Sequence, residues 1–445
     1  MAKQIKEELA FMLPIDPESP YMKTKRRVLT RRGVVWLGQT CNLRCQFCYF
    51  LDRIKRKDHP EHPFMSLNKA KQICSLLVNH YGNNAVDIQG GEPMIFPEIY
   101  QLVEYCRQIG LLPTLITNAL VLANEDKCNQ LADAGIRDLL VSVHGLGNTY
   151  DTLVGVQGAH SKQMQALDNL QKLGIPFRFN CVLSKSALPE IDKIAGLAVK
   201  KGARAVNFIA FNPFEDQQKS GKRSAENVPT YKEISSYLDQ ALDILAEGSI
   251  EGNVRYVPIC LVSERHRKSL YNFQQLPYDL HEWDYASWSW TGMQPQRMKE
   301  GALQPPVSLA DSTFTAARYK GWLKQVADIG REMIHRFPTL RPIATFIHKN
   351  ISLAIHGKTK VSHIHQLYRE NAKLRASAHC RYTYAEACYS CAAKGICDGL
   401  HGDYADFFGM DGVNPITNLS PIDDPKEFIK DQEKGVEHED YEWAL

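Results

Sequence analysis

The stretch "GVVWLGQTCNLRCQFCYF", residues 33–50, joins a short apolar run to three closely spaced cysteines. The run is typical of a buried strand, and Cys41, Cys45 and Cys48 follow it directly. A closed tetrahedral metal site takes four ligands, so three thiols in one loop leave one position open. The stretch therefore predicts a strand that ends in a metal site able to take a further ligand.

Short apolar runs alternate with amphipathic segments from residue 33 to residue 247. The runs are "GVVWLG", "AVDIQ", "LLPTLIT", "DLLVSV", "FRFNCVL" and "AVNFIAF". Several of the intervening segments have helical period and end in glycine, a common helix stop. This alternation predicts a parallel sheet covered by helices, as an open doubly wound sheet or a partial barrel. In both folds, ligands collect at the carboxyl ends of the strands.

Composition excludes few functions. The chain has 445 residues, 44% of them hydrophobic, and its formal charge of +3 is too small to predict a nucleic-acid or membrane partner. No apolar signal core begins the chain, and no later stretch approaches the roughly 18 uninterrupted apolar residues of a membrane-spanning helix. We therefore expect a cytoplasmic protein, whose twelve cysteines stay thiols unless a metal takes them.

Four of these cysteines lie singly inside regular apolar patterns, where a thiol is a small buried hydrophobe. They are Cys74, Cys106, Cys128 and Cys181. The three clustered thiols have a different use, because three thiolates can hold three irons of a [4Fe-4S] cluster and leave the fourth iron open. A structural zinc would need a fourth ligand, and the candidates His59 and His62 have a spacing unlike that of common zinc sites.

Further motifs follow in a fixed order along the chain. The pattern CxxxCxφC, with Phe47 before the last cysteine, precedes "DIQGGEP", "LITN" and "VSVHG", each at the end of an expected strand. Together they resemble the radical S-adenosylmethionine (radical SAM) superfamily over residues 33–215. The residues that this resemblance assigns to SAM are Phe47, Gly90, Gly91, Glu92, Pro93, Asn118, Ser142, and Arg178 or Asn180 on the fifth strand. His144 stands where the superfamily usually has an aspartate.

The resemblance implies a definite chemistry. SAM binds the open iron of the [4Fe-4S] cluster on Cys41, Cys45 and Cys48, and one electron cleaves it to methionine and a 5'-deoxyadenosyl radical. That radical abstracts a hydrogen atom from a small metabolite or a peptide, for net oxidation or modification in a biosynthetic pathway. A flavodoxin- or ferredoxin-type protein is the implied reductant.

A second cysteine group lies near the end of the chain. Cys388, Cys391 and Cys397 form CxxCx5C, with Cys380 eight residues before the first of them. The run resembles the centre of SPASM-type domains, which hold auxiliary iron–sulfur clusters, but His401 stands where the next cysteine of that run belongs. We expect one auxiliary [4Fe-4S] cluster on these four thiols, in a shortened, twitch-like domain. A structural zinc on the same thiols is the alternative.

Cys260 allows three interpretations. It lies in "VRYVPIC", where related enzymes place the first auxiliary ligand, so it competes with Cys380 for that role. It could also be a buried thiol, or the hydrogen-atom donor to a substrate radical, as in radical SAM epimerases.

Aromatic and acidic residues gather between residues 278 and 290. Aromatic faces beside carboxylates suit a sugar, a nucleoside or a cationic amine, although a plain aromatic plug between domains is the alternative interpretation. The substrate candidates are His144, Tyr278, Asp279, Glu282, Trp283 and Trp288.

The predicted fold is α/β, a partial (β/α)6 TIM-like barrel with a mainly helical, cysteine-containing C-terminal domain. The expected units are an N-terminal extension (1–32), the barrel (33–247), an aromatic connector (248–312), a helical segment (313–378), the auxiliary-cluster domain (379–420) and an acidic tail (421–445), read as a docking or loosely held segment. Two other functions stay open: redox-neutral epimerisation or rearrangement with Cys260 as hydrogen donor, and an iron–sulfur electron carrier or scaffold without SAM chemistry.

Overall fold

The fold was analysed in a computed structural model. It describes residues 21–27, 32–48, 62–79, 83–219, 221–279 and 380–437. Between residues 280 and 379 it describes only 322, 329–330, 333, 336–340, 343, 369, 372–373 and 376–377. Among these residues, no helix is both long enough and apolar enough to cross a membrane.

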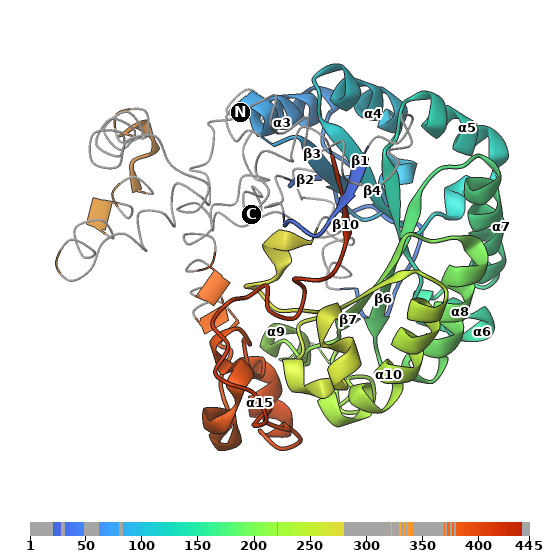
Figure 1. The fold of residues 1–445 in the computed structure, drawn as a ribbon. Helices are drawn as coiled ribbons and strands as arrows, with labels where there is room; N and C mark the ends of the chain where they lie inside the picture. The colour runs from blue at the N-terminus through green and yellow to red at the C-terminus, as the bar shows by residue number, and fades with distance from the viewer. Residues whose placement is uncertain are drawn as a thin grey trace, which may run out of the picture.

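A curled parallel sheet of eight strands forms the centre of the protein (Figure 1). Its strands are β2 (Arg32–Trp36), β3 (Ala85–Gln89), β4 (Leu112–Thr117), β5 (Asp138–Ser142), β6 (Phe177–Leu183), β7 (Ala205–Ala210), β8 (Glu251–Arg255) and β9 (Leu270–Tyr271). Every strand pairs in parallel with its neighbours in sequence order. Because the order never reverses, the sheet is a partial TIM-like barrel and not a doubly wound sheet.

Helices cover the outer face of this sheet as an arc (Figure 1). They are α3 (Leu67–Asn79), α4 (Ile99–Gln108), α5 (Glu125–Asp133), α6 (Gly147–Val154), α7 (Ala159–Lys172), α8 (Ile191–Lys201) and α10 (Tyr231–Glu247). The first six strands confirm the six predicted apolar runs. The last two lie inside the expected connector, so the sheet continues past residue 247.

The two faces of the sheet have opposite character, because successive side chains of a strand point to opposite faces. Val141, Phe179 and Phe208 face the helices and are fully buried in the main apolar core. Ser142 and Asn180 lie beside each other in the register of β5 and β6, on the concave face. Alternation thus places polar side chains in the barrel interior, while the four singly placed cysteines are buried, as predicted.

The two ends of the described chain meet. β1 (Tyr21–Thr24) and β10 (Lys434–Glu437) form an antiparallel ribbon (Figure 1). The buried Arg27 guanidinium donates to the carbonyl of Ile429 and to Gln432 Oε1, which also accepts from the Tyr271 hydroxyl at 2.8 Å. Residues 421–437, expected as a docking or loosely held segment, are therefore attached to the barrel.

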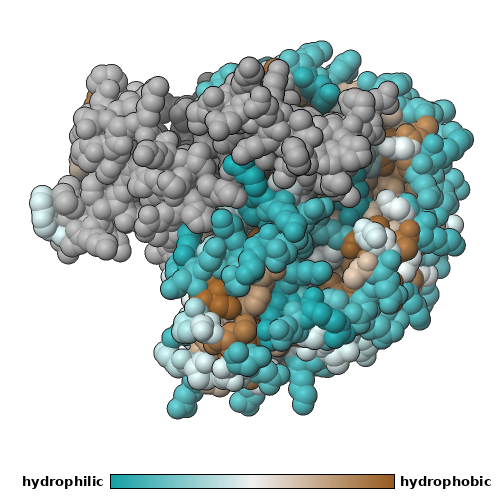
Figure 2. Space-filling view, viewed as in Figure 1, coloured by the Kyte–Doolittle hydropathy of each residue, from teal (hydrophilic) through white to brown (hydrophobic). Residues whose placement is uncertain are grey.

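The cysteine-containing C-terminal segment lies beside the later strands of the barrel (Figure 1). It contains the short 3-10 helices η10 (Glu386–Ser390) and η11 (Ala392–Gly395), and helix α15 (Gly402–Phe408), which lies near α9 (Glu215–Lys219) of the barrel. Figure 2 shows a mainly hydrophilic surface over the helical arc, with a hydrophobic patch over the C-terminal segment, where Phe407 and Met410 are exposed.

Candidate functional site

The loop with the first three cysteines leaves the carboxyl end of β2 and rests on α6. Leu43 packs with Tyr150 and Val154 in a small apolar cluster, against which Cys41 and Cys45 lie. The backbone N–H of Arg44 donates to the Val154 carbonyl at 2.8 Å, and that of Gln46 to the Leu153 carbonyl at 2.9 Å. Residues Arg44 and Gln46 thus fix this part of the loop to the end of α6.

The three thiols share one electrostatic environment. Burial, followed by the nearby Glu92 carboxylate, raises the pKa of Cys41 to about 12. Burial and the charges of Cys48 and Cys41 raise the pKa of Cys45. Three thiolates so close together need a cationic partner to be stable when buried.

Three thiol side chains in one loop are the donor type that a [4Fe-4S] cluster uses. Among the described residues, no three His, Cys, Asp or Glu side chains are arranged to hold one metal ion. A [4Fe-4S] cluster binds each thiolate through a different iron, so its thiols do not converge on one point. The Leu43 N–H also donates to Cys41 Sγ at 3.4 Å, the type of contact that tunes cluster thiolates.

The glycines after β3 bring that strand end against the cysteine loop. The Gly91 N–H donates to the Gly38 carbonyl and the Glu92 N–H to the Thr40 carbonyl, both at 2.9 Å. A Cβ on Gly91 would overlap the Thr40 carbonyl, and one on Gly90 would lie 2.8 Å from the Gly38 oxygen. Glycine is thus required by the chain's own backbone, a reason beyond the close approach of a ligand.

Glu92 is buried, and its carboxylate forms hydrogen bonds that connect the ends of β3 and β4. Its Oε1 accepts from the Met94 N–H at 2.9 Å, where Pro93 begins the 3-10 helix η1 (Pro93–Ile95), and from the Thr117 hydroxyl at 2.6 Å. Its Oε2 accepts from the Asn118 N–H at 2.7 Å. Burial raises the pKa of Glu92 to about 7, although these three donors oppose the shift.

Asn118, at the end of β4, connects the motifs to one another. Besides its N–H bond to Glu92, its Nδ2 donates to Asn42 Oδ1 at 2.8 Å, and Asn42 directly follows Cys41. Its carbonyl accepts from Gln163 Nε2 of α7 at 3.0 Å. The cysteine loop, the glycine motif and β4 therefore form one hydrogen-bonded unit.

His144 and Phe47 meet beside this unit. Their rings lie edge to face with centroids 4.5 Å apart, and His144 Nδ1 accepts from the Val182 N–H of β6 at 3.1 Å. Burial lowers the pKa of His144 to about 3, so the imidazole is neutral and carries its proton on Nε2. His144 is thus a fixed donor next to the cysteine loop.

The two candidate SAM-binding residues on β6, Arg178 and Asn180, lie at different distances from the carboxyl end of the strand. Arg178, only 1% exposed, donates from Nε to Asp138 Oδ2 at 2.9 Å, and Asp138 is the first residue of β5. Asn180 lies two residues nearer the carboxyl end, level with Ser142. Its Oδ1 is buried and has no hydrogen-bond partner among the described residues. Asn180 is the candidate nearer the strand ends that carry the cysteine loop.

Three of the four cysteines expected in the second group share a cavity with Cys260, the competing candidate. Cys260, Cys388, Cys391 and Cys397 line one small, partly open apolar cavity. The Ile416 N–H donates to Cys391 Sγ and the Gly399 N–H to Cys397 Sγ, both at 3.4 Å. Cys260 accepts a backbone hydrogen bond from Asn414. Four thiols from two segments of the chain therefore surround one space.

Cys380 does not line this cavity. It packs against a separate apolar cluster that contains Tyr271, Phe273 and Tyr278. The Cys380 carbonyl accepts from the Gly402 N–H at 3.2 Å, which attaches the residue to the start of α15.

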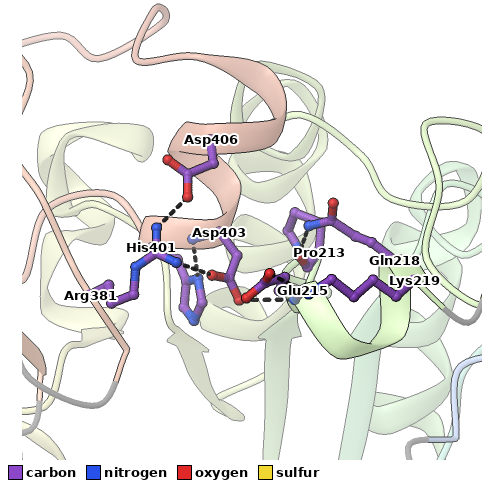
Figure 3. Close-up of polar contacts among 8 residues, drawn as sticks. All are labelled: Pro213, Glu215, Gln218, Lys219, Arg381, His401, Asp403 and Asp406. Atoms are coloured by element: carbon purple, nitrogen blue, oxygen red, sulfur yellow. Dashed lines mark hydrogen bonds and ion pairs between the residues drawn. The ribbon is translucent and has the colours of Figure 1, made fainter.

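His401, at the place of the missing cysteine, caps α15. Its Nδ1 accepts from the Asp403 N–H at 3.2 Å, and its ring lies 5.2 Å from that of Phe214, which follows β7. Figure 3 shows the polar junction around it, in which Asp403 accepts from the Glu215 N–H at 3.1 Å and from Arg381 at 3.4 Å. His401 thus joins the C-terminal segment to the barrel.

Two substrate candidates of the connector are described. Tyr278 is buried in the apolar cluster that also holds Cys380, and Asp279 forms a fully buried ion pair with Arg255 of β8. Glu282, Trp283 and Trp288 lie outside the described residues.

Sequence reasoning missed Asn42, Tyr150 and Gln163. Asn42 directly follows Cys41, and this position could have indicated that it lies near the site. Tyr150 and Gln163 occur in ordinary amphipathic helix patterns, which carry no signal of a site.

Comparisons with known proteins agree with this site. The profile of the Radical SAM superfamily matches residues 37–197. The chain is 26% identical over 184 residues to AdoMet-dependent heme synthase of Oleidesulfovibrio alaskensis, which covers 41% of this chain and 46% of that protein. It is 29% identical over 169 residues to PqqA peptide cyclase of Methylorubrum populi, covering 38% and 42% respectively. The matched segments thus span less than half of each relative.

A solved structure was also matched. The crystal structure of Streptococcus suis SuiB aligns with a TM-score of 0.42 at 17% identity, over 51% of this chain and 49% of that one. The superfamily profile covers the cysteine loop, the glycine motif and the ends of β4 to β6, all of which the fold brings together. Residues 37–197 of the chain thus match the radical SAM superfamily and form a radical SAM domain.

Proposed function

We propose that this chain is a radical SAM enzyme that abstracts a substrate hydrogen atom in a biosynthetic reaction, with net oxidation or modification of a small metabolite or peptide. The observation that carries the proposal is the hydrogen-bonded unit in which Asn118 connects Asn42 of the cysteine loop to Glu92 of the glycine motif. When bound, a [4Fe-4S] cluster and SAM supply the 5'-deoxyadenosyl radical that performs the abstraction.

The chain's own residues hold these two groups. Cys41, Cys45 and Cys48 bind the cluster and leave one iron open for SAM. The backbone around the two glycines and the polar groups of the strand ends bind SAM. The proposed SAM-binding residues are Phe47, Gly90, Gly91, Glu92, Pro93, Asn118, Ser142 and Asn180. We place Arg178 second to Asn180, because its guanidinium is already paired with Asp138.

We further propose one auxiliary [4Fe-4S] cluster on Cys260, Cys388, Cys391 and Cys397. Two observations support this set: the four thiols line one cavity, and backbone N–H groups point at three of the sulfurs. Cys380, expected as the fourth ligand, packs in another cluster. Four thiolates close the coordination, so this cluster would transfer electrons or stabilise the fold and would not bind SAM.

The position of Cys260 bears on the epimerase alternative. A hydrogen-atom donor must reach the substrate radical, whereas Cys260 lies among three other thiols in the C-terminal cavity. This arrangement favours a ligand role, and therefore net oxidation over redox-neutral epimerisation.

The proposed substrate class rests on the named relatives. Relatives named as a heme synthase and a peptide cyclase show that radical SAM domains similar to this one act in the biosynthesis of both kinds of product. We propose a small metabolite or a peptide as substrate, and a flavodoxin- or ferredoxin-type protein as electron donor.

The test is SAM cleavage by the anaerobically reconstituted protein with a chemical reductant, with 5'-deoxyadenosine and methionine measured by mass spectrometry. We expect both products from wild type and none from the variant with Cys41, Cys45 and Cys48 changed to Ala. Cys128→Ala, which removes a buried thiol far from both groups in sequence, is the control. A fully loaded wild type that forms no 5'-deoxyadenosine would instead support an electron carrier or scaffold.

A further inference from the structure

Gln163 lies on α7, behind the strand ends of the site, and is fully buried. Its Nε2 lies 3.0 Å from the Asn118 carbonyl, 2.9 Å from the Ser142 carbonyl and 2.9 Å from the Tyr150 hydroxyl. One amide nitrogen thus contacts the end of β4, the end of β5 and helix α6.

The orientation of this amide is fixed by its surroundings. If nitrogen and oxygen were exchanged, the Gln163 oxygen would face two carbonyl oxygens, neither of which can donate a hydrogen bond. As it stands, Oε1 is buried and has no hydrogen-bond partner among the described residues. The side chain therefore acts through its nitrogen alone.

Each of the three residues that Gln163 contacts belongs to a different part of the site. Asn118 bonds to the glycine motif through its N–H and to the cysteine loop through its Nδ2. Ser142 is the candidate SAM residue of the next strand. Tyr150 belongs to the apolar cluster on which Cys41 and Cys45 rest. Gln163 contacts all three of these residues.

We propose that Gln163 is a positioning residue for SAM, which holds the ends of β4 and β5 in register with the cysteine loop through its contacts with Asn118, Ser142 and Tyr150. The inference rests on the proposed function, because SAM is the ligand whose binding residues are being aligned. Gln163 itself does not touch SAM. Its loss leaves the Asn118 and Ser142 carbonyls without this donor, and the strand ends then shift to find other partners.

The test compares Gln163→Leu with Gln165→Leu in the anaerobically reconstituted holoprotein. Gln165 lies on the same helix, is exposed, and bonds only to Asn169 one turn later, so the same substitution there leaves the site untouched. Three quantities are measured: iron per chain, the dissociation constant for SAM, and the change that SAM causes in the electron paramagnetic resonance spectrum of the reduced cluster.

We expect Gln163→Leu to keep its iron and to bind SAM about tenfold more weakly, as for a lost buried hydrogen-bonding group. Its spectral change at a fixed, subsaturating SAM concentration should shrink accordingly, while Gln165→Leu stays within about twofold of wild type.

A Gln163→Leu protein with lowered thermal stability but unchanged SAM affinity and spectral response would make Gln163 a purely structural residue and overturn the inference. If this variant does not fold, Gln163→Met, which is unbranched and fills the same space, is read by the same criteria. A wild type that neither binds SAM nor changes its spectrum with SAM would contradict the proposed function itself, a result independent of any Gln163 variant.

Discussion

The two cysteine groups differ in how the chain assembles them. Cys41, Cys45 and Cys48 come from one loop, and their neighbours are strand ends with polar side chains, notably Asn118. The C-terminal thiols come from two segments about 130 residues apart and line an apolar cavity. A local loop of three thiols leaves a coordination position open beside polar groups, which is what binding a further ligand requires. Four thiols brought together by tertiary contacts would close the proposed second site.

The groups also differ in what supports them. Hydrogen bonds from β3, β4 and α7 converge on the first loop and its neighbours. Backbone N–H groups of Gly399 and Ile416 point directly at sulfurs of the second. The first group is therefore sensitive to changes in the surrounding strand ends, and the second to changes in its own backbone.

The largest expected effect is a pair of glycine substitutions that each disrupt one group. In Gly91→Ala the new Cβ would overlap the Thr40 carbonyl, and in Gly399→Ala it would overlap the Thr383 carbonyl at a residue with φ of +88°. We expect each to cost about 3 kcal/mol or more in unfolding free energy, by backbone overlap. Iron analysis should show a loss of about four irons per chain in each variant, the content of one cluster.

Gly196→Ala is the control for both. This glycine lies in α8, and no atom lies within 4 Å of the added Cβ, so the change should stabilise the protein by about 0.5–1 kcal/mol. Loss of about eight irons per chain in either variant, the content of both clusters, would show that the two groups are not independent.

A second comparison separates Cys260 from Cys380. Cys260→Ala removes a thiol from the cavity wall, so about four irons per chain should be lost. Cys380→Ala removes a thiol that packs in a different apolar cluster, so the iron content should stay at the wild-type value. The reverse pattern would restore the ligand set predicted from the sequence.

The smallest expected effect is a pH dependence of the unfolding free energy. It arises from Glu92, which lies beside the first cysteine group. Its pKa is about 7 in the folded protein and near 4.5 in the unfolded chain. The folded state thus binds the Glu92 proton more tightly than the unfolded state does. The contribution of this group to the unfolding free energy is therefore complete at low pH and is lost as pH rises towards and past 7. Wild type should lose about 2 kcal/mol between about pH 5.5 and about pH 8 from this group.

Urea unfolding at the two pH values measures this loss. Glu92→Gln cannot titrate there, so its stability, although lower throughout, should change less between them. An identical change in both proteins would assign the pH dependence to other groups.

Local patterns predicted much of the barrel. The six apolar runs from Gly33 to Phe211 are strands, because buried parallel strands have a distinctive composition. The cysteine loop and the glycine motif lie in contact because they follow the carboxyl ends of β2 and β3, which are neighbouring parallel strands. In both cases the relevant contact is between adjacent strands, where sequence order determines position.

Tertiary contacts bear on what the sequence alone left open, as between Cys260 and Cys380, or missed, as for Gln163. Cys260 and Cys397 share a cavity although 137 residues separate them, whereas the nearer Cys380 does not reach it. Gln163 occupies a helix position with no polar signature, and its role appears only once α7 lies behind β4 and β5. Spacing within one segment does not fix which side chains of distant segments meet.

The most direct test of two independent cysteine sites, one open and one closed, is the iron and sulfide content of the variant with Cys41, Cys45 and Cys48 changed to Ala. Measured after anaerobic reconstitution beside wild type, the variant should retain about four irons and four sulfides per chain, the content of one [4Fe-4S] cluster. A variant with no iron, or with zinc in its place, would contradict a closed iron–sulfur site formed by Cys260, Cys388, Cys391 and Cys397.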